Sequence, residues 1–318
     1  MLFLGNYVMI AKLFKSPLSK IGAKIKQIKL KRLWNKAVKG RKVNISLIAR
    51  KLYLMVLDIE TIGAIGSQIP YDIGITIITN LKKVVYTIAL IISDIFDNDN
   101  LMQTAYYKEK ISFYKSKLIT DSNYVKQDVV QVINQLQNIF NHYAIPVYFA
   151  YNGSFDRLGL INLYDTYIND NNNFLKNIKV VDIMYVATQV ILKNVDIYEE
   201  YMYFCYTNGF ITPSGKNISF NAESVFAFLM NRPIFAENHT GLEDTFCEKD
   251  LLLMLVYYYE YKYHKDLIIN CLDTNQTTSL IHYTKKGGAL NVDKAEQITQ
   301  TKQKEKNNKK GFFSRIFD

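Results

Sequence analysis

Residues 52–61 read Leu-Tyr-Leu-Met-Val-Leu-Asp-Ile-Glu-Thr, an apolar run that predicts a buried β-strand ending in two acidic residues. Asp58 and Glu60 are two residues apart, so both side chains point to the same face of that strand. Two adjacent carboxylates repel each other and resist the loss of water unless a cation lies between them. Exposed strand ends also carry such pairs, and this stretch alone therefore does not specify a metal site.

The segments around this strand predict an α/β fold. Further strands are expected from β-branched or apolar runs at 72–79, 84–91 and 146–150. Helices are expected near 99–118, near 125–142, from Ser154, near 183–207, from the cap Asn221 to about Met230, and over about 241–264. Strands come first and in the middle, with helices between and after them, which indicates a mixed β-sheet flanked by helices.

The net charge of +10 comes from one end of this 318-residue chain. Residues 1–51 hold 14 of the 39 basic residues and no acidic residue, which leaves 25 basic against 29 acidic side chains elsewhere. Within this segment Leu or Ile recurs every three or four residues among lysines, a pattern that gives one narrow apolar stripe on an otherwise cationic helix. We expect residues 1–51 to form a basic, partly disordered arm. Contact with nucleic-acid phosphates and with an anionic membrane surface are both open as its role.

The C-terminal composition and the cysteine count indicate where the folded domain ends and which classes of protein are excluded. Residues 289–310 are rich in Lys, Gln and Asn and are expected to be a disordered linker, which makes 289–318 a tail behind a domain at 52–288. The aromatic end at 312–317 is either a docking peptide for a replication partner or a frayed terminus. Three cysteines without a CxxC pair exclude a disulfide scaffold and a thiolate zinc site. We expect a cytoplasmic protein. The frequent Ile, Lys, Asn and Tyr fit codons of an AT-rich genome and suggest that the protein is encoded by a bacterium, plasmid or phage.

Two later segments also place acidic residues at element ends. In 148–156 an apolar strand runs into a turn, and Asp156 falls in the first turn of the next helix, where the helix dipole also favours an acid. His239 precedes the last long helix, and Asp244 lies in its first turns. At 100° per residue, Asp244 falls within about 20° of Leu251 on the apolar face. A buried aspartate is costly unless it binds something, whereas a lone histidine is commonly a hydrogen-bonded structural residue.

Together these segments predict a metal site with oxygen ligands. Carboxylates without thiolates suit Mg²⁺ or Mn²⁺. Two such ions about 4 Å apart can hold the attacking and leaving oxygens of a phosphodiester during hydrolysis. A histidine beside them can deprotonate the attacking water.

These three segments resemble the DEDD superfamily of 3′–5′ exonucleases, in its His-containing branch (DEDDh), which includes replicase proofreading subunits and phage-type exonucleases. Asp-Ile-Glu-Thr-Ile-Gly at 58–63 is similar to the first family motif, Asn-Gly-Ser-Phe-Asp at 152–156 to the second, and His-Thr-Gly-Leu-Glu-Asp at 239–244 to the third. The resemblance covers about residues 52–265. It implies a ribonuclease H-like fold and release of mononucleotides from the 3′ end of a nucleic acid, with DNA favoured over RNA, in replication, repair or proofreading.

The resemblance also implies a role for each matching residue. Asp58 would bridge two metal ions, Glu60 and Asp244 would complete the first site, and Asp156 would hold the second. His239 would be the general base.

Three further residues are implied in substrate binding. Thr61 would help to position the 3′-terminal nucleotide, and Asn152 and Phe155 belong to the second motif. Phe155 is interpreted first as a core residue. Departures from the family pattern at Tyr151 and Gly241 leave the four acids and the histidine intact.

Other readings of the sequence stay open. Phe246-Cys-Glu-Lys-Asp250 imitates the spacing of the Tyr-x-x-x-Asp motif of family B polymerase exonucleases, although the phenol is missing and Asp250 points away from the apolar face. A non-catalytic nucleic-acid-binding protein, or a membrane-surface protein, that retains the fold is the other class of function.

Overall fold

The computed structural model describes residues 53–79, 83–145, 147–170, 172–263 and 290–303. The basic arm at 1–51 and the aromatic end at 312–317 lie outside the described residues.

A six-stranded mixed sheet forms the centre of the molecule, in the order β4-β3-β2-β1-β5-β6. β1 pairs antiparallel with β2, and β2 with β3, while β1–β5, β5–β6 and β3–β4 are parallel. The strands span β1 Tyr53–Ile62, β2 Ile69–Thr79, β3 Lys83–Ile92, β4 Tyr124–Gln127, β5 Val147–Ala150 and β6 Lys179–Asp182.

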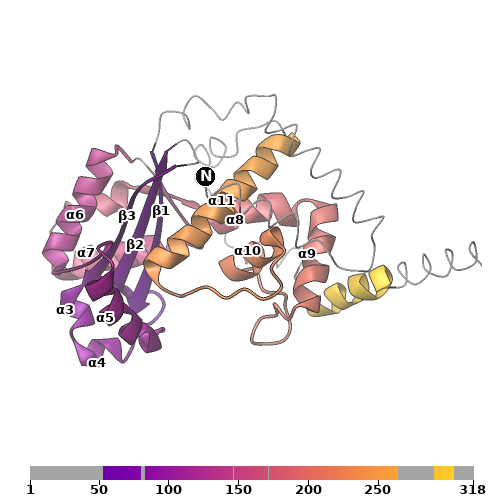
Figure 1. Ribbon diagram of the computed structural model, residues 1–318, viewed down its shortest axis with the longest axis horizontal. Coiled ribbons are helices and arrows are strands. Elements are labelled where there is room, and N and C mark those ends of the chain that lie inside the picture. Colours follow the sequence, from indigo (N-terminus) through magenta and orange to yellow (C-terminus); the bar gives the residue numbers. More distant parts are fainter. Residues whose placement is uncertain (1–52, 80–82, 146, 171, 264–289, 304–318) are drawn as a thin grey trace, which may run out of the picture.

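Helices cover both faces of this sheet, as Figure 1 shows: α6 and α7 lie on one side, and α11 crosses the other with α8, α9 and α10 beyond it. The helical segments are α3 Ser93–Phe96, α4 Asp99–Met102, η1 Lys108–Lys110, α5 Ile111–Thr120, α6 Val129–His142, α7 Gly153–Tyr167, η2 Phe174–Asn177, α8 Ile183–Ala187, η3 Thr188–Leu192, α9 Val195–Thr207, α10 Ala222–Met230 and α11 Gly241–Tyr263. The α/β class with a mixed sheet flanked by helices is confirmed.

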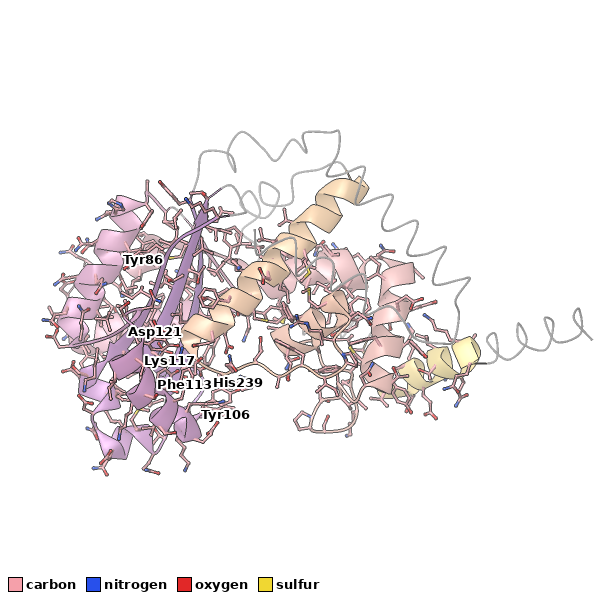
Figure 2. All side chains as sticks on the ribbon, viewed as in Figure 1. Tyr86, Tyr106, Phe113, Lys117, Asp121 and His239 are labelled. Carbon is pink, nitrogen blue, oxygen red and sulfur yellow. The ribbon has the colours of Figure 1, made fainter. Side chains whose placement is uncertain are left out.

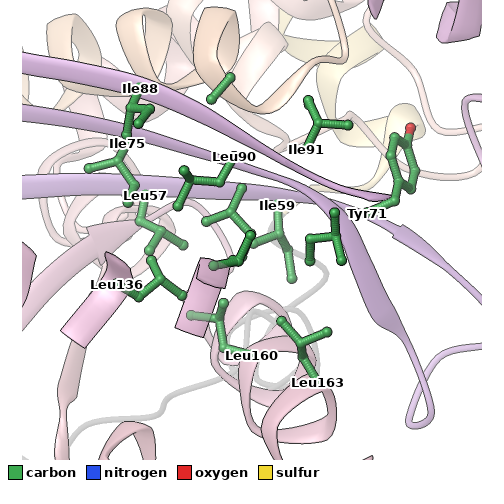
Figure 3. Close-up of a cluster of buried hydrophobic side chains, with 14 of the residues drawn as sticks. Leu57, Ile59, Tyr71, Ile75, Ile88, Leu90, Ile91, Leu136, Leu160 and Leu163 are labelled. Carbon is green, nitrogen blue, oxygen red and sulfur yellow. The ribbon is translucent and has the colours of Figure 1, made fainter. Parts of the chain in front are cut away.

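Alternation along β1 divides the core into two clusters. Met55, Leu57 and Ile59 pack with α6 and α7 in the first cluster, part of which Figure 3 shows around Leu136 and Leu160. The intervening Leu54 and Val56 belong to the second cluster, together with Leu251 and Leu255 of α11. Because strand side chains alternate between faces, Asp58 and Glu60 continue the row that faces α11.

Contacts with β2 bring α11 close to the sheet. A Cβ atom on Gly74 of β2 would overlap the backbone of Gly241, so glycine at this position allows the first turn of α11 to approach. One turn later the hydroxyls of Thr76 and Thr245 share a buried hydrogen bond of 2.7 Å. The N-terminal turns of α11 are therefore held directly over the middle of the sheet.

Several expected boundaries were wrong for identifiable reasons. The helix expected near 125–142 begins only at Val129, where Asp128 and Gln131 form a capping box, and 124–127 is strand β4. The region near 99–118 is divided among α4, η1 and α5. Strand β6 was not expected. Four-residue edge strands such as β4 and β6 depend on hydrogen bonds from a neighbouring strand, and their own residues carry little signal.

The expectation of disorder over 289–310 is wrong for its first part. Residues 292–303 form a helix, drawn in yellow in Figure 1, and Leu290 and Ala295 are buried in the second core cluster. The backbone of Ile218 donates to Leu290, so this segment is attached to the loop before α10. The polar composition of this segment predicted disorder, but its few apolar residues pack into the core and hold the helix in place.

No helix within the described residues combines the length and apolar character needed to cross a bilayer.

Candidate metal centre

Three carboxylates meet where β1 ends beneath α11. One oxygen from each of Asp58, Glu60 and Asp244 lies within 4.8 Å of the other two. Glu60 and Asp244 are buried, with 7% of each residue exposed, and Asp58 is half-buried. The sheet supplies the first two carboxylates and the helix the third, and this buried cluster can hold a metal ion.

Buried hydrogen bonds fix the start of α11 and hence Asp244. Asp72 of β2 accepts from the backbone N–H of Gly241 at 2.8 Å and from the hydroxyl of Tyr114 at 2.7 Å. Thr240 donates to Glu243 at 2.7 Å, which is a side-chain contact within the first turn. These bonds satisfy groups that a helix end would otherwise leave without partners, and they set the depth at which Asp244 enters the site.

Asp156 reaches the same end of the sheet from α7. Asn152 has a left-handed backbone with φ of 61°, and its N–H donates to Asp182 at 3.0 Å, which ends β5 and starts α7. Oδ1 of Asp156 then accepts from the backbone N–H of Ile59 at 3.2 Å. Oδ2 is buried and has no hydrogen-bond partner within the described residues. Asp156 is thus bonded to β1 at Ile59, the residue between Asp58 and Glu60, and its second oxygen is available to a ligand.

His239 lies just before α11. Its backbone is left-handed, with φ of 53°, and its ring stacks on that of Tyr107 with 4.2 Å between centroids and 6° between planes. Figure 2 shows His239 on the chain leading into α11, across from Tyr106 and Phe113. Burial and the charge of Lys110 lower the pKa of His239, which favours the neutral imidazole.

The pKa values of the acidic residues in this cluster are raised above their ordinary range. Burial raises the pKa of Asp58 well above its usual range, and the charges of Glu248 and Asp156 raise it further. Burial likewise raises the pKa of Glu60, with Asp244 adding to the shift. Burial raises the pKa of Asp244 to about 7, although backbone hydrogen bonds from His239 and Thr240 lower it in part.

Basic side chains do not relieve this repulsion. Among the described residues, Lys and Arg form ion pairs only with acids outside this group. The free oxygen of Asp156 and the crowded carboxylates fit a bound divalent cation, which would replace both the missing counter-charge and the missing hydrogen bonds.

The three substrate-binding candidates lie in different surroundings. Thr61 is buried at the end of β1, after a register shift between Glu60 and Thr61. Asn152 is exposed on the turn before α7. Phe155 is half-buried and packs against the first core cluster, and its carbonyl accepts from Gln68 at 3.2 Å. This packing agrees with the interpretation of Phe155 as a core residue.

The structure also brings in residues that were not expected at the site. Asp72 supports the start of α11, Tyr107 stacks on His239, and Glu248 is buried on α11 one turn after Asp244. Helical spacing places Glu248 about 40° from Asp244, so the sequence indicates only that the two acids lie on the same side of this helix. Asp72 and Tyr107 had no such local signal.

The alternative third motif leads away from the cluster. Asp250 pairs with its neighbour Lys249 at 3.0 Å, and its side chain is 47% exposed. Phe246, at the position of the missing phenol, is also exposed.

No protein-family model matches this chain, and no curated protein sequence is significantly similar to it.

Proposed function

We propose that this chain is a 3′–5′ exonuclease of the DEDD type, in its His-containing branch, which hydrolyses phosphodiester bonds of DNA with two divalent cations. The observation that carries the proposal is the meeting of Asp58, Glu60 and Asp244 within 4.8 Å. Asp156 is bound to the backbone of the same strand. These are the four acids that the motif resemblance selects, and a mixed sheet flanked by helices fits the ribonuclease H-like fold that it implies.

The cation ligands follow from these positions. Asp58 would bind both ions, Glu60 and Asp244 the first, and Asp156 the second. When bound, two such ions stabilise the charge that develops on the attacking and leaving oxygens.

His239 supplies the proton acceptor. Its lowered pKa leaves the imidazole neutral near pH 7, so it can take a proton from a water molecule whose oxygen attacks phosphorus. The bond from phosphorus to the 3′ oxygen of the preceding nucleotide then breaks, that oxygen takes up a proton to give the 3′ hydroxyl of the shortened strand, and a nucleoside monophosphate leaves. The stack on Tyr107 restricts the orientation of the imidazole.

The proposal is tested with 5′-labelled single- and double-stranded DNA and RNA in Mg²⁺, Mn²⁺ or EDTA. We expect a ladder of products shortened from the 3′ end, on DNA in preference to RNA, and no cleavage in EDTA. Asp58→Ala should lower the rate by several orders of magnitude, and His239→Ala by about 10²- to 10⁴-fold. Circular dichroism spectra should stay unchanged.

Asp250→Asn is the matched control on the same helix. It should retain wild-type activity, because Asp250 pairs with Lys249 outside the cluster. Loss of activity in Asp250→Asn with retention in His239→Ala would favour the family B reading. Full activity in Asp58→Ala would show that these carboxylates do not catalyse the reaction. A folded wild type that binds DNA without EDTA-sensitive cleavage would favour the non-catalytic class.

A further inference from the structure

Glu248 on α11 is a buried acid that the four-carboxylate pattern does not use. Only 3% of the residue is exposed, and its Oε2 has no hydrogen-bond partner within the part of the chain that is described. None of the ion pairs among those residues includes it. A carboxylate in this environment is unfavourable unless a ligand completes it.

The other oxygen of Glu248 is anchored beside Asp58. Oε1 accepts from the backbone N–H of Tyr151 at 3.2 Å. Val56 of β1 pairs with Phe149 of β5 in parallel register. Asp58 lies two residues after Val56, and Tyr151 lies two residues after Phe149, just beyond the end of β5. The Glu248 carboxylate is therefore attached to the sheet level with Asp58.

Asp156 has the same arrangement on the neighbouring strand. One of its oxygens accepts from Ile59 of β1, while the other is buried without a partner among the described residues. Asp156 and Glu248 are thus each fixed by one oxygen to the backbone near Asp58, one on β1 and the other at the residue that follows β5. The second oxygen of each has no hydrogen-bond partner within the described residues.

The electrostatics agree with this proximity. Apart from burial, Glu248 is the strongest influence raising the pKa of Asp58, and Asp156 is the strongest charge raising that of Glu248.

We infer that Glu248 is a fifth carboxylate ligand of the metal centre, which holds the second divalent cation together with Asp58 and Asp156. The inference rests on the proposed two-cation function and adds to it a residue outside the motif. Oxygen donors from three carboxylates suit Mn²⁺ or Mg²⁺.

Glu248→Gln is the variant that isolates this role. The amide oxygen of Gln can still accept from Tyr151, so the backbone anchor is kept, while the charged ligand is removed. Mn²⁺ is titrated into the metal-free full-length protein by isothermal calorimetry. We expect two ions on the wild type and on the control Asp250→Asn. In Glu248→Gln the second ion should bind at least about tenfold more weakly or be lost.

Thermal unfolding gives a second readout that a purely structural role would not produce. In metal-free buffer near pH 8, Glu248→Gln should melt at a higher temperature than the wild type, because one of three mutually repelling carboxylates is removed. Its stabilisation by Mn²⁺ should be smaller. A structural carboxylate would instead show a lower metal-free Tm and an unchanged Mn²⁺ effect, which overturns the inference. If Glu248→Gln does not fold, Glu248→Met replaces it in the same two measurements.

The outcomes separate this inference from the proposed function. If Asp244→Asn loses an ion while Glu248→Gln binds two with wild-type affinity, Glu248 is not a ligand and the proposed function stands. If the wild type binds no Mn²⁺, both are wrong.

Discussion

His239 combines a left-handed backbone with a stacked ring, and each feature restricts the imidazole. A non-glycine residue in this conformation costs about 1–3 kcal/mol, and it persists only where surrounding contacts impose it. The stack on Tyr107 and the bond from the backbone of His239 to Asp244 are such contacts. The proposed general base and one of the proposed metal ligands are therefore positioned by the same short segment.

Tyr107 should act as a positioning residue for His239. Tyr107→Phe keeps the stacked ring and should retain nearly full activity. Tyr107→Ala should lower kcat about 10- to 100-fold with little change in KM, because the imidazole loses its orientation. Steady-state kinetics on a short DNA substrate measures both constants. Equal kcat values for the two variants would contradict this role.

Asp58 should reduce stability in the absence of metal. Asp58→Asn removes one of several mutually repelling, buried carboxylates. We expect it to raise the free energy of unfolding by about 1–2 kcal/mol in metal-free buffer at pH 8, while it abolishes cleavage. Urea denaturation of Asp58→Asn and of the control Asp250→Asn measures the change. The control should differ from the wild type by less than about 0.5 kcal/mol.

At the level of elements, the contact between α11 and β2 determines whether a site exists. Gly74 and Gly241 let the helix backbone approach the strand, and Thr76 and Thr245 bond across the same interface. A helix displaced outward would separate Asp244 from the two acids of β1. The small residues on these elements are thus as necessary to the candidate centre as its carboxylates.

Gly74→Ala should displace α11. The added Cβ overlaps the backbone of Gly241, which cannot rotate away as a side chain could. We expect a loss of about 1–3 kcal/mol in the free energy of unfolding, together with weaker Mn²⁺ binding. Urea denaturation and calorimetry measure the two effects. Unchanged values for both would show that the interface adapts without moving Asp244.

For the whole molecule, charge is divided between a slightly acidic body and a strongly basic arm. The body gathers acids in a buried cluster that can hold a cation. The arm at 1–51 lies outside the described residues, and its role stays a prediction.

Mn²⁺ affinity should rise with pH. Burial raises the pKa of Asp244 to about 7 and that of Glu237 to about 8, so the folded metal-free protein binds protons that the unfolded chain releases near pH 4. Metal-free stability should therefore fall as pH increases from about 4 to 8. A cation competes with these protons, so calorimetry should show tighter Mn²⁺ binding at pH 8 than at pH 6. Equal affinities at both pH values would contradict a site made of these acids.

The basic arm should add sequence-independent affinity for nucleic acid. Deleting residues 1–51 removes 14 positive charges and should weaken DNA binding and flatten its dependence on salt, with the cleavage chemistry retained. Fluorescence anisotropy over a range of KCl concentrations measures both. Unchanged DNA binding, together with liposome flotation that is lost on deletion, would assign the arm to a membrane surface instead.

The sequence alone determined the features that depend on neighbours along the chain. Alternation in β1 predicted that Asp58 and Glu60 share a face, and the helical period predicted that Asp244 is buried with Leu251, which is confirmed. The cap at Asn221 is also confirmed, since its side chain accepts from Ser224. These patterns are local because strand and helix periodicities are set by the backbone itself.

Which distant residues meet depends on the tertiary structure. The bond from Ile59 to Asp156 joins residues 97 apart, and that between Thr76 and Thr245 joins residues 169 apart. Strands β4 and β6, and the helix at 292–303, owe their structure to elements remote in sequence. A periodic pattern specifies which face of an element is buried, whereas the partner on that face depends on packing across the whole chain, and so Glu248 could be placed beside Asp58 only once the fold was known.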